Sequence, residues 1–161
     1  MVTRPNDCKD CDFVMAAKRN DNKYLITETP YNIVMLNPKL SPFLGRSAVI
    51  PKFHTKYYSD LHGESLLSFF RQVDLLKSVL HLAFGAVQTL DVRVKSSTAH
   101  VNYDVIPHYE KGVVRFADQE FRSTDYETGI YLRTYRDAPP LADDLIEKII
   151  DAMRNAYARK I

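Results

Sequence analysis

Residues 64–87 carry the pattern that most constrains the fold of this chain. Apolar side chains recur there at steps of three and four residues, which is the spacing of one face of a long α-helix. They are Leu66, Phe69, Phe70, Val73, Leu76, Leu80, Phe84 and Val87. Strand-like runs precede and follow this helix instead of alternating with further helices. The pattern therefore predicts an α+β domain with an antiparallel sheet, in preference to repeated β-α-β units.

The strand-like runs before the helix predict one side of that sheet. Residues 23–28 and 32–36 lie on either side of a Thr-Pro-Tyr turn, which predicts a hairpin. Residues 47–50 predict a short buried strand, and Pro51 ends it because proline cannot continue a central strand.

The second half of the chain predicts further strands and a terminal helix. The extended runs are 90–95, 99–106, 112–116 and 129–136. We expect 112–116 to pair with its predecessor. Pro139 and Pro140 then introduce an amphipathic helix. Its apolar side holds Leu141, Leu145, Ile149, Ala152, Met153 and Tyr157.

Length and composition set broad limits. The 161 residues are 45% hydrophobic and 26% charged, which suits one globular domain and excludes a disordered or collagen-like chain. The net charge of +2 is too small to predict binding to nucleic acid or an anionic membrane. Neither a membrane span nor a secretory signal is evident, so we expect a cytoplasmic protein.

Two cysteines near the N-terminus form a Cys-x-x-Cys pair. Cys8 and Cys11 could hold two positions of a tetrahedral zinc ion, with His54 and His100 as candidates for the rest. The same spacing also suits a redox pair or two unrelated thiols. A thioredoxin-like role is disfavoured because no β-α-β pattern surrounds the pair.

The run from His100 to Ile106 alternates polar and apolar residues. In a strand this would place His100, Asn102 and Asp104 on one face, opposite the apolar side chains. Such a polar row is typical of a solvated sheet surface, and it would also suit a binding or catalytic site.

Over residues 8–125 these features resemble the histidine triad (HIT) superfamily. The motifs occur in the family's order: Cys8-x-x-Cys11, Asn37-Pro38, Gly45-Arg46-Ser47-Ala48-Val49-Ile50-Pro51-Lys52-Phe53-His54, the long helix, and His100-x-x-x-x-Val105-Ile106-Pro107. The resemblance implies an antiparallel sheet of about five strands with the long helix packed on it. We expect a HIT-like domain at 1–137 and a C-terminal helical extension of the same domain at 138–161. The family also commonly forms homodimers through the long helix and a sheet edge.

The resemblance also implies a metal site. In zinc-containing HIT proteins and the related galactose-1-phosphate uridylyltransferases, two cysteines, an upstream histidine and the first triad histidine bind the metal. The matching residues here are Cys8, Cys11, His54 and His100. Four protein ligands leave no open position, so the Zn²⁺ would be structural.

The triad itself departs from the family's His-x-His-x-His. Its second position, the nucleophile that attacks the α-phosphate, is Asn102, and its third is Asp104. A carboxamide nitrogen has no available lone pair, so Asn102 cannot act as that nucleophile. Arg46 stands where many members have a histidine, and His108 replaces the arginine that often follows Ile-Pro.

The resemblance implies nucleotide contacts as well. Asn37 matches a ribose-binding position, and Ser97 and Thr98 match a phosphate-binding segment. We also expect Asn102 and Asp104 to contact the nucleotide. The alternatives are a turn-forming asparagine and solvent-facing hydroxyls.

Three functions follow from these features. The first is a zinc-containing, nucleotide-binding protein without nucleotidyl transfer. The second is a hydrolase of nucleoside phosphoramidates or dinucleoside polyphosphates, in which Asp104 or His108 directs water attack. In the third, zinc only fixes the N-terminal segment and the protein acts through a partner protein.

Overall fold

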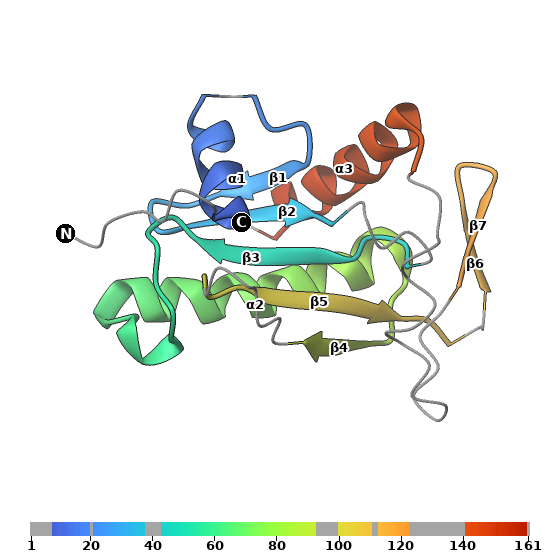
Figure 1. The fold of residues 1–161 in the computed structure, drawn as a ribbon. Coiled ribbons are helices and arrows are strands. Elements are labelled where there is room, and N and C mark those ends of the chain that lie inside the picture. Colours follow the sequence, from blue (N-terminus) through green and yellow to red (C-terminus); the bar gives the residue numbers. More distant parts are fainter. Residues whose placement is uncertain are drawn as a thin grey trace.

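The computed structural model describes residues 8–19, 21–37, 43–92, 100–110, 113–122 and 141–160. In chain order the elements are α1 (Lys9–Lys18), β1 (Leu25–Glu28), β2 (Asn32–Leu36), β3 (Ser47–Pro51), a 3-10 turn (Tyr58–Asp60), α2 (Gly63–Phe84), β4 (Gln88–Val92), β5 (Tyr103–His108), β6 (Val113–Phe116), β7 (Gln119–Arg122) and α3 (Asp143–Ala158). This is the predicted α+β class (Figure 1).

A five-stranded antiparallel sheet forms the centre of the molecule. Its strand order is β1-β2-β3-β5-β4, so β5 lies between β3 and β4 although α2 separates them in sequence. The predicted hairpin is confirmed as β1 and β2. The strand predicted at 47–50 is confirmed as β3, but it includes Pro51, which pairs with Asn32, instead of ending before it. Because β3 and β5 are antiparallel neighbours, the segment after β3 lies next to the segment before β5.

Alternate residues of the central strands pack against different helices. Val34 of β2 belongs to the larger core with α2 and α3. Its neighbours Ile33 and Met35 belong to a smaller cluster beneath α1. Because successive side chains of a strand point to opposite faces, α1 covers one face of the sheet and α2 with α3 cover the other (Figure 1).

The long helix α2 ends three residues earlier than the sequence pattern predicts. Gly85 adopts a left-handed conformation, with φ of 72°, and its N–H donates to the carbonyl of His81. This glycine cap ends the helix before Val87, which then pairs with β5. Gly45 is required nearby, because a Cβ there would lie 2.7 Å from the ring of Phe84.

Two predictions about the later strands are wrong. The strand expected at 99–106 begins only at Tyr103, because the N–H of Val101 donates to Thr55 outside the sheet instead of to a neighbouring strand. The strand at 112–116 becomes β6 and pairs with β7 instead of its predecessor. A tight turn with positive φ at Ala117 and Asp118 joins the pair.

The C-terminal helix is confirmed as α3. Its apolar side packs in the same core as α2, and the guanidinium of Arg154 donates to the carbonyls of Leu25 and Ile26 in β1. Residues 93–95 and 129–136, which were also expected to be extended, lie outside the described residues.

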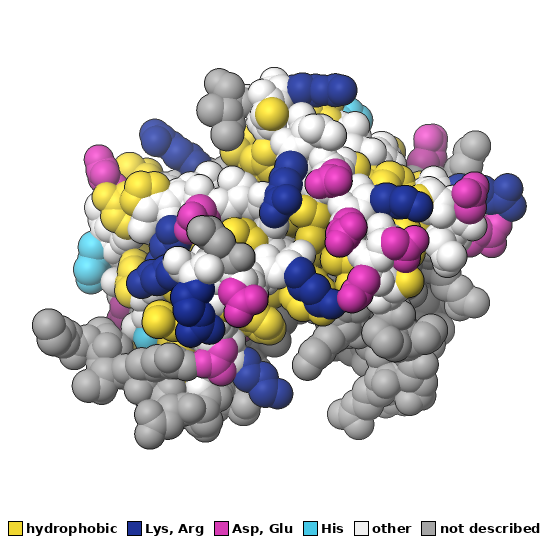
Figure 2. Space-filling model, turned by 90° about the horizontal axis from the view of Figure 1, so that it is seen from above, with side chains coloured by type: hydrophobic (Ala, Val, Ile, Leu, Met, Phe, Trp, Pro, Cys, Tyr) yellow, Lys and Arg dark blue, Asp and Glu magenta, His cyan; other side chains and the backbone are white. Residues whose placement is uncertain are grey.

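The described helices include none with the length and apolar character needed to cross a bilayer. Acidic and basic side chains are interspersed on the face of the molecule shown in Figure 2. The charge therefore does not gather into a single-sign field on this face.

Candidate metal centre and the polar residues beside it

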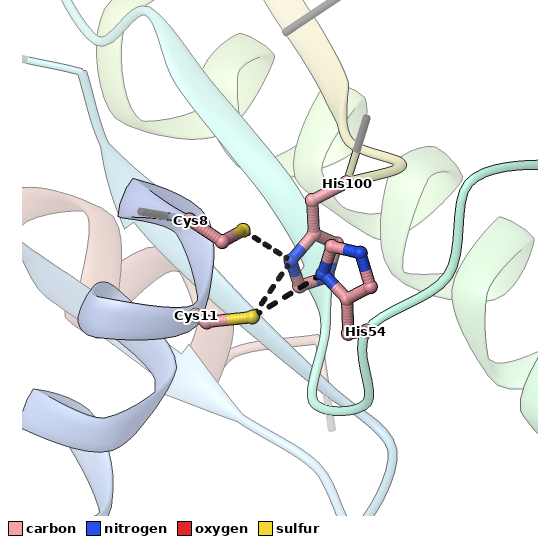
Figure 3. A group of neighbouring side chains, drawn as sticks. All are labelled: Cys8, Cys11, His54 and His100. Carbon is pink, nitrogen blue, oxygen red and sulfur yellow. Dashed lines mark hydrogen bonds between the residues drawn. The ribbon is translucent and has the colours of Figure 1, made fainter. Parts of the chain in front are cut away.

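Four side chains from three separate segments converge at one end of the sheet. Cys8 caps the N-terminus of α1 and Cys11 lies in its first turn, whereas His54 follows β3 and His100 precedes β5. One donor atom from each residue lies within 4.8 Å of the other three (Figure 3). All four residues are buried. The structure therefore brings together the full set that the sequence predicted.

Both sulfur atoms contact the ring of His100, and the sulfur of Cys11 also contacts the ring of His54. His100 Nδ1 lies 3.5 Å from each sulfur, and His54 Nδ1 lies 3.4 Å from that of Cys11 (Figure 3). The two rings meet edge to face, with centroids 4.9 Å apart. Because the cysteines are three residues apart at the start of a helix, both lie on one side of it.

The environment of His100 leaves its Nδ1 free to act as a donor atom. Its Nε2 lies 3.2 Å from the carbonyl of Pro51, which can only accept, so Nε2 carries the hydrogen. Burial lowers the pKa of His100, an effect that the nearby charge of Asp10 partly opposes. The ring is therefore neutral near pH 7, with a lone pair on Nδ1 directed at the sulfurs.

Asn102, at the nucleophile position of the triad pattern, is hydrogen-bonded on both sides. Its Nδ2 donates to the Asp10 carboxylate at 3.0 Å, and its backbone carbonyl accepts from the Tyr58 hydroxyl at 2.6 Å. Its Oδ1 is buried and has no hydrogen-bond partner among the described residues. The amide of Asn102 thus holds the segment between the two cysteines.

Asp104, at the third triad position, forms an ion pair with Arg46. The Nε of Arg46 donates to the two carboxylate oxygens at 3.1 and 2.9 Å, and Nη2 contacts the same carboxylate. Both residues are buried, so the row expected on one strand face is not a solvated surface at this position. Burial raises the pKa of Asp104, and the adjacent guanidinium opposes that change.

The remaining candidate residues lie elsewhere or are not described. The N–H of Asn37 donates to the carbonyl of Arg46 at the end of β2. His108 ends β5, roughly 16 Å along the strand from Tyr103 at the usual rise per residue, so it does not join the cluster. Ser97 and Thr98 lie outside the described residues.

Sequence reasoning missed Asp10 and Tyr58, and it treated Arg46 and Asp104 as unrelated departures. Asp10 lies inside the Cys-x-x-Cys motif. Once Cys8, Cys11 and His100 are assigned as ligands of one metal, the sequence therefore indicates that Asp10 lies near His100. The opposite charges of Arg46 and Asp104 were a second signal that the two residues pair.

Comparisons with known proteins agree with this architecture. No protein-family model matches the chain, and no curated protein matches it. The solved structure of a hypothetical histidine triad nucleotide-binding protein from Sulfolobus tokodaii matches with a TM-score of 0.67 and 19% identity, over 92% of this chain and 93% of that one.

Two further solved structures show the same fold. A zinc-bound histidine triad family protein from Mycobacterium smegmatis matches with a TM-score of 0.61 and 18% identity, over 96% of this chain and 95% of that one. Diadenosine triphosphate hydrolase of Plasmodium falciparum matches with a TM-score of 0.60 and 13% identity, over 87% and 80%. The chain therefore has the fold of the histidine triad proteins.

Proposed function

We propose that this protein is a zinc-containing, nucleotide-binding HIT-fold protein that lacks nucleotidyl-transfer activity. The observation that carries the proposal is the buried Cys8, Cys11, His54 and His100 cluster beside a triad in which asparagine replaces the nucleophile. His100 of the cluster is also the first triad position, and Asn102 and Asp104 follow it where the chain enters β5.

The donor spacing fits zinc. With the usual Zn–S length of about 2.3 Å and Zn–N length of about 2.0–2.1 Å, tetrahedral angles separate sulfur from nitrogen by about 3.5 Å. Three of the Sγ to Nδ1 separations are 3.4–3.5 Å. Two thiolates and two neutral imidazoles are also a common donor set for structural zinc. When bound, the ion would fix α1 against the segments that carry His54 and His100.

The residues at the triad positions support the absence of covalent catalysis. The Asn102 amide is not nucleophilic and is already bonded to Asp10. The Asp104 carboxylate is buried and paired with Arg46, so a water molecule has no accessible base at this position. His108 lies at the far end of β5. These positions disfavour the water-attack hydrolase.

Nucleotide binding is the further part of the proposal. It rests on the fold, on Asn37 at the end of β2 and on the Ser97-Thr98 segment before His100. These contacts do not require the missing histidine. Cysteines that bind zinc must be reduced, and a reducing compartment keeps them so. We therefore include a cytoplasmic location in the proposal.

The experiment that tests this proposal combines metal analysis, nucleotide binding and turnover on one preparation. We expect one zinc per chain by elemental analysis and saturable binding of a mononucleotide by calorimetry. We also expect no hydrolysis of dinucleoside polyphosphates or nucleoside phosphoramidates above a no-enzyme control. Metal-free protein would refute the zinc assignment, provided that no chelator was used in purification. Hydrolysis by the unmodified protein that is abolished by His108→Ala, or by an Asp104→Ala variant shown to be folded, would establish the hydrolase instead.

We also propose that the protein forms a homodimer through α2 and the β4 edge of the sheet. Leu67 and Phe70 of α2 are 57% and 43% exposed, and Leu82 and Val87 are also exposed. The strand order places β4 at an edge of the sheet beside this helix. A two-fold axis there would pair like surfaces and cover these apolar side chains.

A further inference from the structure

Three segments must meet for the Cys and His donors to converge, and residues 100–102 contact the other two. The Nε2 of His100 donates to the carbonyl of Pro51, and the N–H of Val101 donates to the carbonyl of Thr55 at 2.7 Å. The Tyr58 hydroxyl donates to the carbonyl of Asn102. These three hydrogen bonds join the segment that carries His100 to the one that carries His54.

A side chain connects the segment of residues 100–102 to α1. The Asn102 amide donates to Asp10, which lies between Cys8 and Cys11 in the first turn of the helix. Asn102 is two residues from His100, and Asp10 is one residue from Cys11. The hydrogen bond therefore links the backbone of both cysteines to the backbone of His100 without using any of the four donor side chains.

We propose that Asn102 is a positioning residue of the metal centre, and that its amide orients the Cys8–Cys11 turn through Asp10. The residue that stands at the nucleophile position thus contributes to metal binding in this chain. The inference rests on the proposed zinc site, because a positioning contact has a measurable effect only where a metal binds.

Asparagine suits this task for a chemical reason. Its amide presents a hydrogen to the carboxylate and carries no charge, so the pair adds no second anion beside the thiolates. Aspartate at position 102 would place two carboxylates at hydrogen-bonding distance, where like charges repel. Outer contacts that orient ligand segments commonly affect metal affinity by 10–100-fold when they are removed.

The test exchanges the two groups. Four variants are compared with the unmodified protein: Asn102→Ala, Asn102→Asp, Asp10→Asn and the double variant Asp10→Asn with Asn102→Asp. The double variant keeps the composition and net charge and reverses the direction of the hydrogen bond. Zinc affinity is measured by competition with a chromophoric chelator, and the visible spectrum of the Co²⁺ form reports the ligand geometry.

We expect Asn102→Ala to weaken zinc binding by roughly 10–100-fold and Asn102→Asp to weaken it further. The double variant should recover most of the affinity, with a Co²⁺ spectrum like that of the unmodified protein. Asp151→Asn on the exposed side of α3 removes a carboxylate far from the site in sequence and serves as the control. It should leave the affinity unchanged.

Two results would overturn the inference. One is an Asn102→Ala variant that binds zinc as tightly as the unmodified protein. The other is a double variant that binds zinc no more tightly than Asn102→Asp alone, since that result would show that the affinity does not depend on the hydrogen bond. If the unmodified protein binds no zinc, the proposed metal site itself fails. If Asn102→Ala is too unstable to purify, the comparison of Asn102→Asp with the double variant decides between the outcomes.

Discussion

Arg46 and Asp104 form an ion pair inside the protein, between the residue that precedes β3 and the second residue of β5. They are 4% and 1% exposed. The sequence analysis identifies each as a departure from the pattern of the family that the chain resembles, and in the structure the two side chains contact each other.

Asp104→Ala should destabilise the fold, because it leaves the Arg46 guanidinium buried without its carboxylate. Breaking a buried pair in this way costs about 3–5 kcal/mol. The free energy of unfolding from urea titration measures the loss. A double variant, Arg46→Met with Asp104→Leu, removes both charges and should be closer in stability to the unmodified protein. Equal losses for the single and double variants would contradict the coupling.

Restoring the triad should require three substitutions. Sequence alone suggests Asn102→His with Asp104→His, but those two changes leave the buried Arg46 without its carboxylate partner. Adding Arg46→His removes that buried positive charge. We expect measurable hydrolysis of a dinucleoside polyphosphate by the triple variant and much less by the double variant, because covalent nucleophiles contribute orders of magnitude in rate. Activity in the double variant equal to that in the triple variant would show that Arg46 is no obstacle.

Cys11→Ser should abolish stoichiometric zinc and lower the thermal midpoint. The ion binds only the folded arrangement of ligands, so its affinity contributes to the free energy of unfolding. Thermal scans with and without a strong chelator provide the measurement. The chelator should lower the midpoint of the unmodified protein and leave that of Cys11→Ser unchanged. A chelator effect of the same size on both proteins would argue against Cys11 as a ligand.

Leu67→Glu should dissociate the proposed dimer. The side chain lies in the exposed apolar surface of α2, and a carboxylate there would be desolvated in the interface. Sedimentation velocity at micromolar concentration distinguishes monomer from dimer. Met15→Glu on α1 makes the same chemical change on the other side of the sheet and should leave the dimer intact. A monomeric unmodified protein would remove the basis of the proposal.

Local patterns in the sequence were sufficient to predict much of the fold. The apolar spacing of α2, the β1–β2 hairpin and the amphipathic face of α3 are each determined within one segment. The convergence of the Cys and His side chains was expected from the resemblance, and the structure confirms it. These features depend on periodicity or on a motif, so a single amino-acid sequence is enough to detect them.

The remaining features depend on contacts between distant segments. The start of β5 is determined by the hydrogen bond from Val101 to Thr55, and no pattern inside 99–106 shows it. The partner of β6 is an exception, because it is determined by the adjacent turn at Ala117 and Asp118 and not by a distant segment. The pairing of Arg46 with Asp104 spans 58 residues. Alternation along a strand cannot reveal a partner on another strand.

The apolar clusters on the two faces of the sheet differ in size, and this difference affects which part of the molecule unfolds locally. Only Val14 and Ala17 of α1 are buried in the smaller cluster, whereas α2 and α3 share an extensive core. If zinc binds as proposed, its removal would take away much of the attachment of α1, and this helix would detach as a separate cooperative unit. Its amide hydrogens should then exchange with deuterium far faster, while those of α2 keep their protection. The N-terminal helix would thereby report metal occupancy as local opening, without unfolding the rest of the protein.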